Sequence, residues 1–400
     1  MNRCTVIVDE KGLSFLEKGQ LWMYRNNLVS IGKEAEDGCI ADIMSESGKY
    51  VATGFLSTVS HVVVRILSTH QDEEIDRSFF ERRIREAWRY RCAVERENLS
   101  NCRIIYGDAD GLPGLVVDRY NDVLSVQMIC KGMEVRKDML YGILKQVLAE
   151  DGEVIHGIYE RFDVKARLKE GLEVYKGRYG NGAFSFDQII SENGLKLHVD
   201  IENGQKTGYF LDQKNNRLLV RHLSYGMRVL DCFTHTGGFA LNAALGGATA
   251  VTAVDVSSVA LEEGKANAKL NGLKNVSFVQ ADVFDYLDTL SVGDFDFIIL
   301  DPPAFTKSRR TIDHAYHGYL SINEKAMHVL RKGGYLATCS CSRYMDTALF
   351  EKMLREAAVS AGVILKQISV TQQNGDHPVL WPMEETSYLK FFMFQVLEKR

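Results

Sequence analysis

The stretch Met227-Arg228-Val229-Leu230-Asp231-Cys232-Phe233-Thr234-His235-Thr236-Gly237-Gly238-Phe239-Ala240 decides the fold of this chain. An apolar run, typical of a buried strand, leads into a glycine turn, and the turn leads into a predicted helix that begins at Gly238. Glycine lets a ligand approach the backbone without meeting a Cβ atom, and the first turn of a helix offers unpaired N–H groups. We therefore expect a ligand to bind at this turn.

Three acidic residues, Asp255, Asp282 and Asp301, each follow an apolar run that is predicted to be a strand, and Pro302-Pro303 ends the last of them. The carboxyl ends of successive strands in an open α/β sheet face one crevice, where such sheets bind ligands. Asp255 stands at the distance from the glycine turn at which dinucleotide-binding folds place the acid that holds ribose hydroxyls. The pattern predicts a ligand with an adenosine-like ribose.

Length and composition limit the class of protein. At 400 residues the chain exceeds what one core usually serves, and 46% hydrophobic and 25% charged residues are ordinary for a globular protein. No apolar run is long enough to span a bilayer, and Asp9 comes too early for a signal peptide, so we expect a cytoplasmic protein with no membrane partner. A net charge of -5 argues against coating nucleic acid through overall charge, but it leaves room for a local basic patch.

The chain divides by pattern into three predicted domains, at residues 1–70, 71–188 and 189–400. The first is rich in short strands separated by glycines, and it carries Trp22 and Arg25 in a run of cations and aromatics. This combination suits RNA, because cations contact phosphates and aromatic rings stack on bases. A packing role for Trp22, with the cations solvated, explains the same residues equally well.

The second domain is predicted to be an α+β domain that supports the others. A helix predicted to start at residues 71–74 carries four apolar residues on one face and five arginines on the others. Acidic residues interleave with these arginines, so a solvated helix face is a simpler explanation than RNA contact.

The third domain is predicted to open with a hairpin over residues 195–204 that turns at Asn203-Gly204. The polar and aromatic loop at 206–217 follows it and suits a second wall of the ligand pocket; alternatively, Asp212 simply caps a helix after a surface turn. The candidate pocket residues in this loop are Tyr209, Gln213 and Arg217. From Met227 to the end strands and helices alternate, as in a doubly wound α/β sheet.

The glycine turn lacks the G-x-G-x-x-G spacing of a dehydrogenase, which weakens the case for a nicotinamide cofactor. The order of turn, acids and Asp301-Pro302-Pro303-Ala304-Phe305 instead resembles the class I S-adenosylmethionine-dependent methyltransferases, which have a Rossmann-like α/β fold. The resemblance implies that S-adenosylmethionine is the cofactor and that Asp301 stands where the methyl group meets its acceptor. The implied cofactor residues are Asp231, Phe233, Gly237 and Gly238 at the methionine end, Asp255 at the ribose, Asp282 and Val283 at the adenine, and Thr236, Val256, Gln213, Arg217 and Asp301 in the same pocket.

Cys339 and Cys341 lie on the strand predicted after Gly333-Gly334, whose carboxyl end is near Asp301, and they share one face because strand side chains alternate. Carbon 5 of cytosine is a poor nucleophile until a thiolate adds to carbon 6, and a carboxylate beside the ring can stabilise that addition. One of these cysteines and Asp301 supply that pair. A C-x-C metal site is the main rival, although no cysteine or histidine cluster is spaced to complete it, and a purely structural pair of thiols also stays open.

The whole chain resembles the bacterial 23S ribosomal RNA cytosine-5 methyltransferases, which join an N-terminal PUA domain, a central α+β domain and a Rossmann-like catalytic domain. The matching stretches are Lys18-Gly19 with Trp22, Asp110-Gly111-Leu112-Pro113-Gly114, Thr207-Gly208-Tyr209-Phe210-Leu211-Asp212-Gln213 with Asn216-Arg217, Asp301-Pro302-Pro303-Ala304-Phe305, Ser340-Cys341-Ser342 and Asp376-His377-Pro378. In that family the nucleophile is the cysteine of Ser-Cys-Ser, which falls on Cys341. A Thr-Cys-Ser motif in other RNA cytosine-5 methyltransferases points to Cys339 instead. Those enzymes also carry a cysteine where this chain has Ala304, and Arg343 stands where the family often has glycine.

The resemblance implies methylation of cytosine in 23S ribosomal RNA without a metal, with Cys341 and Asp301 as the catalytic residues. The implied RNA contacts are Trp22, Arg25, Tyr209, Phe305 and Lys307. A homodimer is one candidate assembly. Two alternatives stay open: guanine methylation, which a related family performs with an Asp-Pro-Pro motif but no nucleophilic cysteine, and a noncatalytic RNA-binding protein that keeps the cofactor fold.

Overall fold

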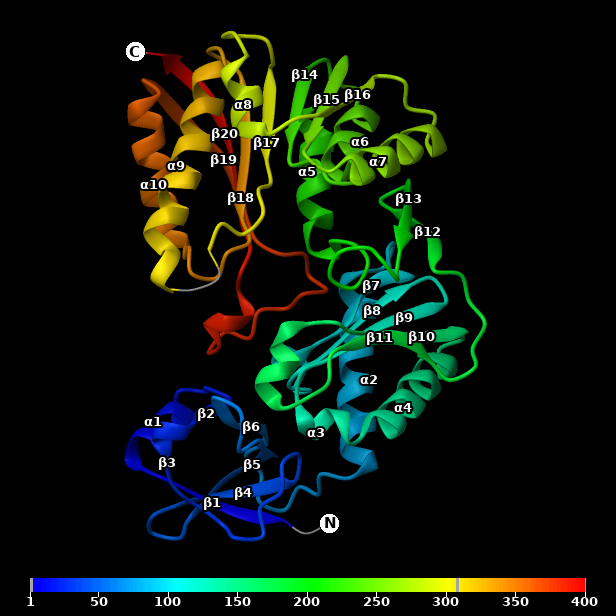
Figure 1. Ribbon diagram of the computed structural model, residues 1–400, viewed down its shortest axis with the longest axis vertical. Coiled ribbons are helices and arrows are strands. Elements are labelled where there is room, and N and C mark those ends of the chain that lie inside the picture. Colours follow the sequence, from blue (N-terminus) through cyan, green and yellow to red (C-terminus); the bar gives the residue numbers. More distant parts are fainter. Residues whose placement is uncertain (1–2, 307–308, 400) are drawn as a thin grey trace. The chain divides into compact units, whose positions relative to one another are not determined.

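The computed structural model describes residues 3–306 and 309–399 and divides them into two compact units. The first unit contains the chain up to Ile190, together with Val199–Leu211 and Gly375–Thr386 (Figure 1). The second contains Ser191–His198, Asp212–Asn374 and the residues from Ser387 onward. Among the described residues, every helix is too short or too polar to cross a membrane. The division into three domains at residues 70 and 188 stays a prediction.

The N-terminal part of the first unit is a six-stranded sheet in the order β2-β6-β5-β4-β1-β3. Its elements are β1 (Cys4–Val8), α1 (Glu10–Glu17), β2 (Trp22–Tyr24), η1 (Arg25–Asn27), β3 (Leu28–Ile31), β4 (Ile40–Ser45), β5 (Tyr50–Leu56) and β6 (Val62–Ser68). Strand β1 alternates, burying Cys4, Val6 and Val8 in the core. The small β domain expected from the sequence is present.

The rest of the first unit is a five-stranded sheet, β11-β10-β9-β8-β7, packed on helices. Its elements are α2 (Arg77–Val94), β7 (Asn101–Tyr106), η2 (Gly107–Asp110), β8 (Leu115–Tyr120), β9 (Val123–Met128), α3 (Lys131–Glu134), α4 (Lys137–Glu150), β10 (Gly157–Phe162), η3 (Lys165–Glu170), β11 (Tyr175–Tyr179) and η6 (Glu384–Thr386). Helix α2 begins later than predicted, because the side chain of Asp76 caps it by accepting a hydrogen bond from the Phe79 N–H at 3.0 Å.

The N-terminal sheet has its own hydrophobic core, but some of its residues pack into the core of the central part. Ile40, Phe55 and Leu67 from the N-terminal sheet pack with Phe80 of α2 in the core of the central part. The Trp22 indole N–H also donates to Asp108 at 2.9 Å. Residues 1–70 are therefore tied to the central part by packing as well as by the chain.

The hairpin between β12 (Asp187–Glu192) and β13 (Leu195–Asp200) corrects the sequence analysis, which put the turn at Asn203-Gly204. The chain turns at Asn193-Gly194 instead, where φ is 51° and 79°. A two-residue hairpin turn of type I′ needs two positive φ angles, which asparagine and glycine tolerate best. Both Asn-Gly pairs fit that rule, so composition alone did not separate them.

The second unit is a seven-stranded sheet in the order β16-β15-β14-β17-β18-β20-β19, and β14 to β18 run parallel (Figure 1). Its strands are β14 (Arg228–Cys232), β15 (Ala250–Asp255), β16 (Val276–Gln280), β17 (Phe297–Leu300), β18 (Tyr335–Ser340), β19 (Val363–Thr371) and β20 (Lys390–Lys399). Its helical elements are η4 (Leu211–Gln213), α5 (Lys214–Leu223), α6 (Gly238–Leu245), α7 (Ser258–Leu270), α8 (Val283–Asp288), η5 (Arg309–Thr311), α9 (Ile312–Val329) and α10 (Thr347–Ser360).

Alternation of strand and helix to the end of the chain was wrong for the last two strands. Strands β19 and β20 follow one another with no α-helix between them, and β20 inserts antiparallel between β18 and β19. A long loop can join antiparallel neighbours without the helical crossover that parallel strands need. The strand order reverses between β14 and β17, which places the ligand crevice at their carboxyl ends.

Candidate active site

The glycine turn after β14 is tightly coiled. Phe233, His235 and Gly237 all have positive φ, at 61°, 51° and 87°. Such angles strain residues other than glycine, and strained turns of this kind gather at functional sites. Helix α6 begins at Gly238, as predicted. Thr236, another predicted cofactor residue, lies within this turn and is buried.

Asp231 is fully buried under this turn. Its Oδ2 accepts hydrogen bonds from the Thr234 hydroxyl at 2.6 Å and the Ala240 N–H at 2.9 Å. Its Oδ1 has no hydrogen-bond partner among the described residues, and burial raises the pKa of this carboxyl to about 7. A buried carboxylate oxygen without a donor is costly, so a ligand group that donates a hydrogen bond would be stabilised here. The ammonium of S-adenosylmethionine fits that requirement.

Asp255 closes β15 with its carboxylate already oriented. Its Oδ2 accepts from the His235 N–H and its Oδ1 from the Ser257 N–H, each at 2.9 Å. One bond to each oxygen leaves further lone pairs for ribose hydroxyls. Burial is the largest effect on His235 and lowers the pKa of its imidazole, which favours a neutral ring beside this acid.

The residues expected near the adenine differ in how exposed they are. Asp282 is exposed and caps α8 by accepting from the Phe284 N–H at 2.8 Å, which agrees with a purely structural role as well. Val283 is buried in the core, so only its backbone is left for a ligand, whereas Val256 is 61% exposed. Their contacts with the cofactor stay predictions.

We expect Asp255→Ala to weaken S-adenosylmethionine binding by about 1.5–3 kcal/mol, the usual worth of a hydrogen bond to a charged group, or roughly 10- to 150-fold in Kd. Calorimetry with the purified chain would measure it. Asp313→Ala, which removes an exposed carboxylate on α9, is the control and should bind as the wild type does. Equal affinity in Asp255→Ala would remove Asp255 from the site.

Asp301, directly after β17, is held by two buried neighbours. The Cys339 thiol donates to Asp301 Oδ1 at 2.9 Å, and the Gln213 amide Nε2 donates to the same oxygen at 3.1 Å. Gln213 is itself oriented by the Asn216 amide, which donates to its Oε1 at 2.7 Å. Burial, and then the charge of Asp301, raise the pKa of Cys339 well above its ordinary value. Cys339 is therefore a neutral donor that orients the carboxylate.

Cys341 lies just beyond the end of β18 and is partly buried. The prediction placed Cys341 on the strand itself, whereas the strand ends one residue earlier; Cys341 still packs against the core that contains Cys339. The serines on either side are both held: Ser340 donates to the Tyr319 hydroxyl at 3.0 Å, and Ser342 to the Thr306 carbonyl at 3.1 Å. The Ser-Cys-Ser turn is thus fixed on both sides of its cysteine.

The remaining predicted pocket residues differ in what holds them. Arg217 forms a buried ion pair with Glu192, with Nη1 2.7 Å from Oε2. The Phe305 ring packs on Tyr319, with ring centroids 4.6 Å apart. Tyr209 belongs to the first unit, where its N–H donates to the buried Tyr120 hydroxyl at 3.0 Å. Lys307 lies outside the described residues. The roles proposed for all four stay predictions.

Within the first unit, the Trp22 indole has contacts at both its edge and the face of its ring. Besides the bond to Asp108, the Arg65 guanidinium lies 5.4 Å from the centre of its ring. This engagement agrees with the packing interpretation of Trp22. Arg25 is exposed, and its guanidinium donates to the Thr58 carbonyl.

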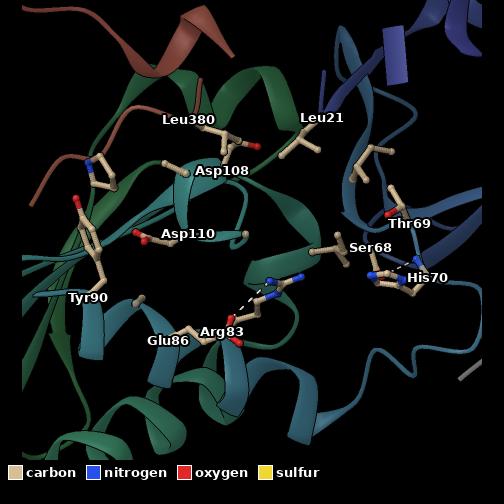
Figure 2. Close-up of a pocket in the computed structure, with 16 residues that line it drawn as sticks. Leu21, Ser68, Thr69, His70, Arg83, Glu86, Tyr90, Asp108, Asp110 and Leu380 are labelled. Atoms are coloured by element: carbon tan, nitrogen blue, oxygen red, sulfur yellow. Dashed lines mark hydrogen bonds and ion pairs between the residues drawn. The ribbon is translucent and has the colours of Figure 1, made fainter. Parts of the chain in front are cut away.

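A cavity of about 490 Å³ opens in the same unit, between the N-terminal sheet and α2 (Figure 2). Cations and acids both line it, with Arg83 and His70 on one hand and Glu86, Asp108 and Asp110 on the other. Asp110 is already paired with Arg91, whose Nη2 lies 2.8 Å from Oδ2. The wall is therefore mixed in charge rather than a basic patch for phosphates.

The comparisons with known proteins agree on one family. The model of S-adenosylmethionine-dependent methyltransferases matches residues 179–382, and that of PUA-like domains matches residues 6–69. Curated relatives called ribosomal RNA large subunit methyltransferase I include those of Klebsiella pneumoniae (strain 342), at 38% identity, and Serratia proteamaculans (strain 568), at 39%. Both alignments cover 94% of this chain, and they cover 94% and 95% of the two relatives. This chain belongs to that methyltransferase family.

Solved structures share the fold. A Streptococcus mutans protein classed with the S-adenosylmethionine-dependent methyltransferases aligns with a TM-score of 0.82 at 22% identity, over 98% of this chain and 100% of its own. SMU.776, a methyltransferase solved in complex with SAH, aligns with a TM-score of 0.83 at 22% identity over the same shares. A PUA-like domain, a Rossmann-like methyltransferase domain and S-adenosylmethionine as cofactor are confirmed.

Proposed function

We propose that this chain transfers a methyl group from S-adenosylmethionine to carbon 5 of a cytosine in 23S ribosomal RNA, in the cytoplasm, with Cys341 as the nucleophile. The names of the relatives support the RNA and the subunit. The observation that supports cytosine is a fixed Ser-Cys-Ser turn after β18, on the strand next to the one that Asp301 follows.

The proposed reaction begins when the Cys341 thiolate adds to carbon 6 of cytosine and the electron pair of the double bond moves to carbon 5. S-adenosylmethionine supplies the methyl group to that carbon when it is bound. A base then removes the hydrogen of carbon 5 as a proton, the double bond returns, and the thiolate leaves. Asp301, oriented by Gln213 and Cys339, hydrogen-bonds the ring and stabilises the charge that the addition creates. Ala304 has no group to act as the base.

The product distinguishes this proposal from its alternatives. RNA from the large subunit would be incubated with the chain and S-adenosylmethionine labelled in its methyl group, and then digested to nucleosides. We expect the label in 5-methylcytidine. Label in a methylguanosine would favour guanine methylation, and RNA binding without label would favour a noncatalytic binder.

The PUA-like domain is proposed to supply RNA affinity rather than chemistry, with exposed Arg25 on a phosphate. Deleting residues 1–70 would open the core shared with α2, so a point change is the cleaner test. We expect Arg25→Ala to weaken RNA binding at every sequence tested and to lower the slope of log K against log salt by about one. Arg355→Ala, which removes a 78% exposed side chain on α10, should leave the slope unchanged. An unaltered slope in Arg25→Ala would remove that phosphate contact.

A further inference from the structure

Lys390 is a buried ammonium that the chemistry above does not use. It is the first residue of β20, in register with Ser340 of β18, and only 7% of its surface is exposed. Its Nζ donates to the Ser342 carbonyl at 2.6 Å and to the Tyr388 carbonyl at 2.9 Å. In the part of the chain that the structure describes, it forms no ion pair with a carboxylate. A buried charge without an anion nearby is unfavourable, so this ammonium calls for an anionic partner.

Cys341 lies between Ser340 and Ser342, and Lys390 interacts with both of these serines. The ammonium is bonded to the carbonyl of the residue after Cys341, and its backbone is paired with the residue before it. The acidic groups whose charge acts on Lys390 are Cys341, Asp346 and Cys339. Asp346 caps α10 by accepting from the Leu349 N–H at 2.8 Å, and burial keeps Cys339 a neutral thiol. Among these groups Cys341 has the largest effect on Lys390, so a thiolate at Cys341 is the anion that the ammonium stabilises most.

We propose that Lys390 is a positioning residue that fixes the Ser-Cys-Ser turn through its carbonyl bonds and stabilises the Cys341 thiolate through its charge. The inference rests on the proposed function, which takes Cys341 as the nucleophile. A nearby cation favours the thiolate form of a cysteine, and the thiolate is the form that attacks. Tyr319 of α9 also interacts with Cys341, and it is neutral because burial raises the pKa of its hydroxyl.

The direction of the pH effect follows from the same contacts. Burial lowers the pKa of Lys390 to about 8, and the charge of Cys341 is the largest effect that opposes this. The ammonium is present below about pH 8 and is lost as the pH rises through that value. Its benefit to Cys341 is therefore greatest below pH 8 and fades above it.

The test measures thiolate formation directly, apart from methylation. The full chain without RNA is treated with iodoacetamide between pH 6 and 10, and alkylation of each cysteine is followed by peptide mass spectrometry. Cys92 of α2, which is partly exposed, is the internal reference. We expect wild-type Cys341 to react at lower pH than Cys92, and Lys390→Met to shift its midpoint upward by about one pH unit or more, as the loss of a close opposite charge does. Lys390→Arg keeps the charge and should keep the low midpoint, and Cys92 should not change in either variant.

Several outcomes would overturn the inference. If Cys341 in the wild type titrates at the same pH as Cys92 or at a higher pH, the inference is overturned. This result needs no variant, so it stands even if Lys390→Met does not fold. A folded Lys390→Met protein, with normal melting and cofactor affinity but an unshifted midpoint, would reduce Lys390 to a packing role. Failure of the proposed function is a separate result, because it is measured by the absence of 5-methylcytidine. The titration of Cys341 by alkylation can be measured whether or not 5-methylcytidine forms.

Discussion

Cys341→Ser should abolish methylation and also abolish the covalent complex that RNA with 5-fluorocytosine at the target position traps in the wild type. Fluorine at carbon 5 cannot leave as a proton does, so the adduct between carbon 6 and the thiolate persists after methyl transfer. We expect kcat to fall by at least about 10³-fold, because losing a covalent nucleophile costs more than losing one hydrogen-bond donor, itself worth about 10²–10³. Denaturing gel electrophoresis separates the trapped complex from free RNA.

Cys339→Ser is the matched control for this experiment. Serine keeps a donor for Asp301, so the hydrogen bond that Cys339 makes at 2.9 Å has a replacement. We expect this variant to methylate and to trap RNA. Trapping that survives in Cys341→Ser and disappears in Cys339→Ser would reverse the assignment, and full activity in both variants would defeat the cytosine-5 mechanism.

The sequence predicted the elements that form the pocket because their signals are local. The glycine turn, the start of α6 at Gly238 and the packing of Cys339 and Cys341 against one core follow from residue spacing of a few positions. The end of the chain could not be predicted in this way. The insertion of β20 between β18 and β19 is a long-range choice, and no short pattern encodes it.

Contacts between distant segments account for what the sequence analysis missed, namely the partner of Arg217 and the position of Lys390. The ion pair of Arg217 with Glu192 and the bond of Lys390 to the Ser342 carbonyl join parts of the chain that are 25 and 48 residues apart. Lys390 did carry one local signal, since it is a lysine directly before the apolar run Phe391-Phe392-Met393-Phe394. A charged residue at a buried strand position suggests a nearby polar site, but it does not say which one.

The Cys339 contact also changes how Asp301 is understood. The sequence paired this carboxylate with a cysteine of the adjacent strand, and the thiol that touches it is that of Cys339 rather than a nucleophile aimed at the base. Cys339 and Gln213 both donate to one oxygen, Oδ1. Two fixed donors on one oxygen orient the carboxylate.

Asp301→Asn should therefore keep the fold and lose most of the activity. The asparagine Oδ1 can accept the same two hydrogen bonds, but the neutral amide can neither carry the charge nor exchange the proton that the addition to the ring requires. We expect kcat for RNA methylation to fall by about 10²–10³-fold, within the range of general acid–base catalysis. The trapped complex with 5-fluorocytosine RNA should form more slowly but still form, because Cys341 is intact.

Cofactor affinity decides what that loss means, because Asp301 was predicted to serve both the reaction and the cofactor. Asp296→Asn makes the same substitution just before the other end of β17, where Asp296 pairs with Arg228 and Arg331, and it should leave both measurements near wild type. A fall in kcat at unchanged affinity for S-adenosylmethionine places Asp301 in the chemistry. A weakened affinity with wild-type kcat at saturating cofactor would instead assign Asp301 to the cofactor site. If neither kcat nor affinity changes, Asp301 has no role in the reaction, although Gln213 and Cys339 orient its carboxylate.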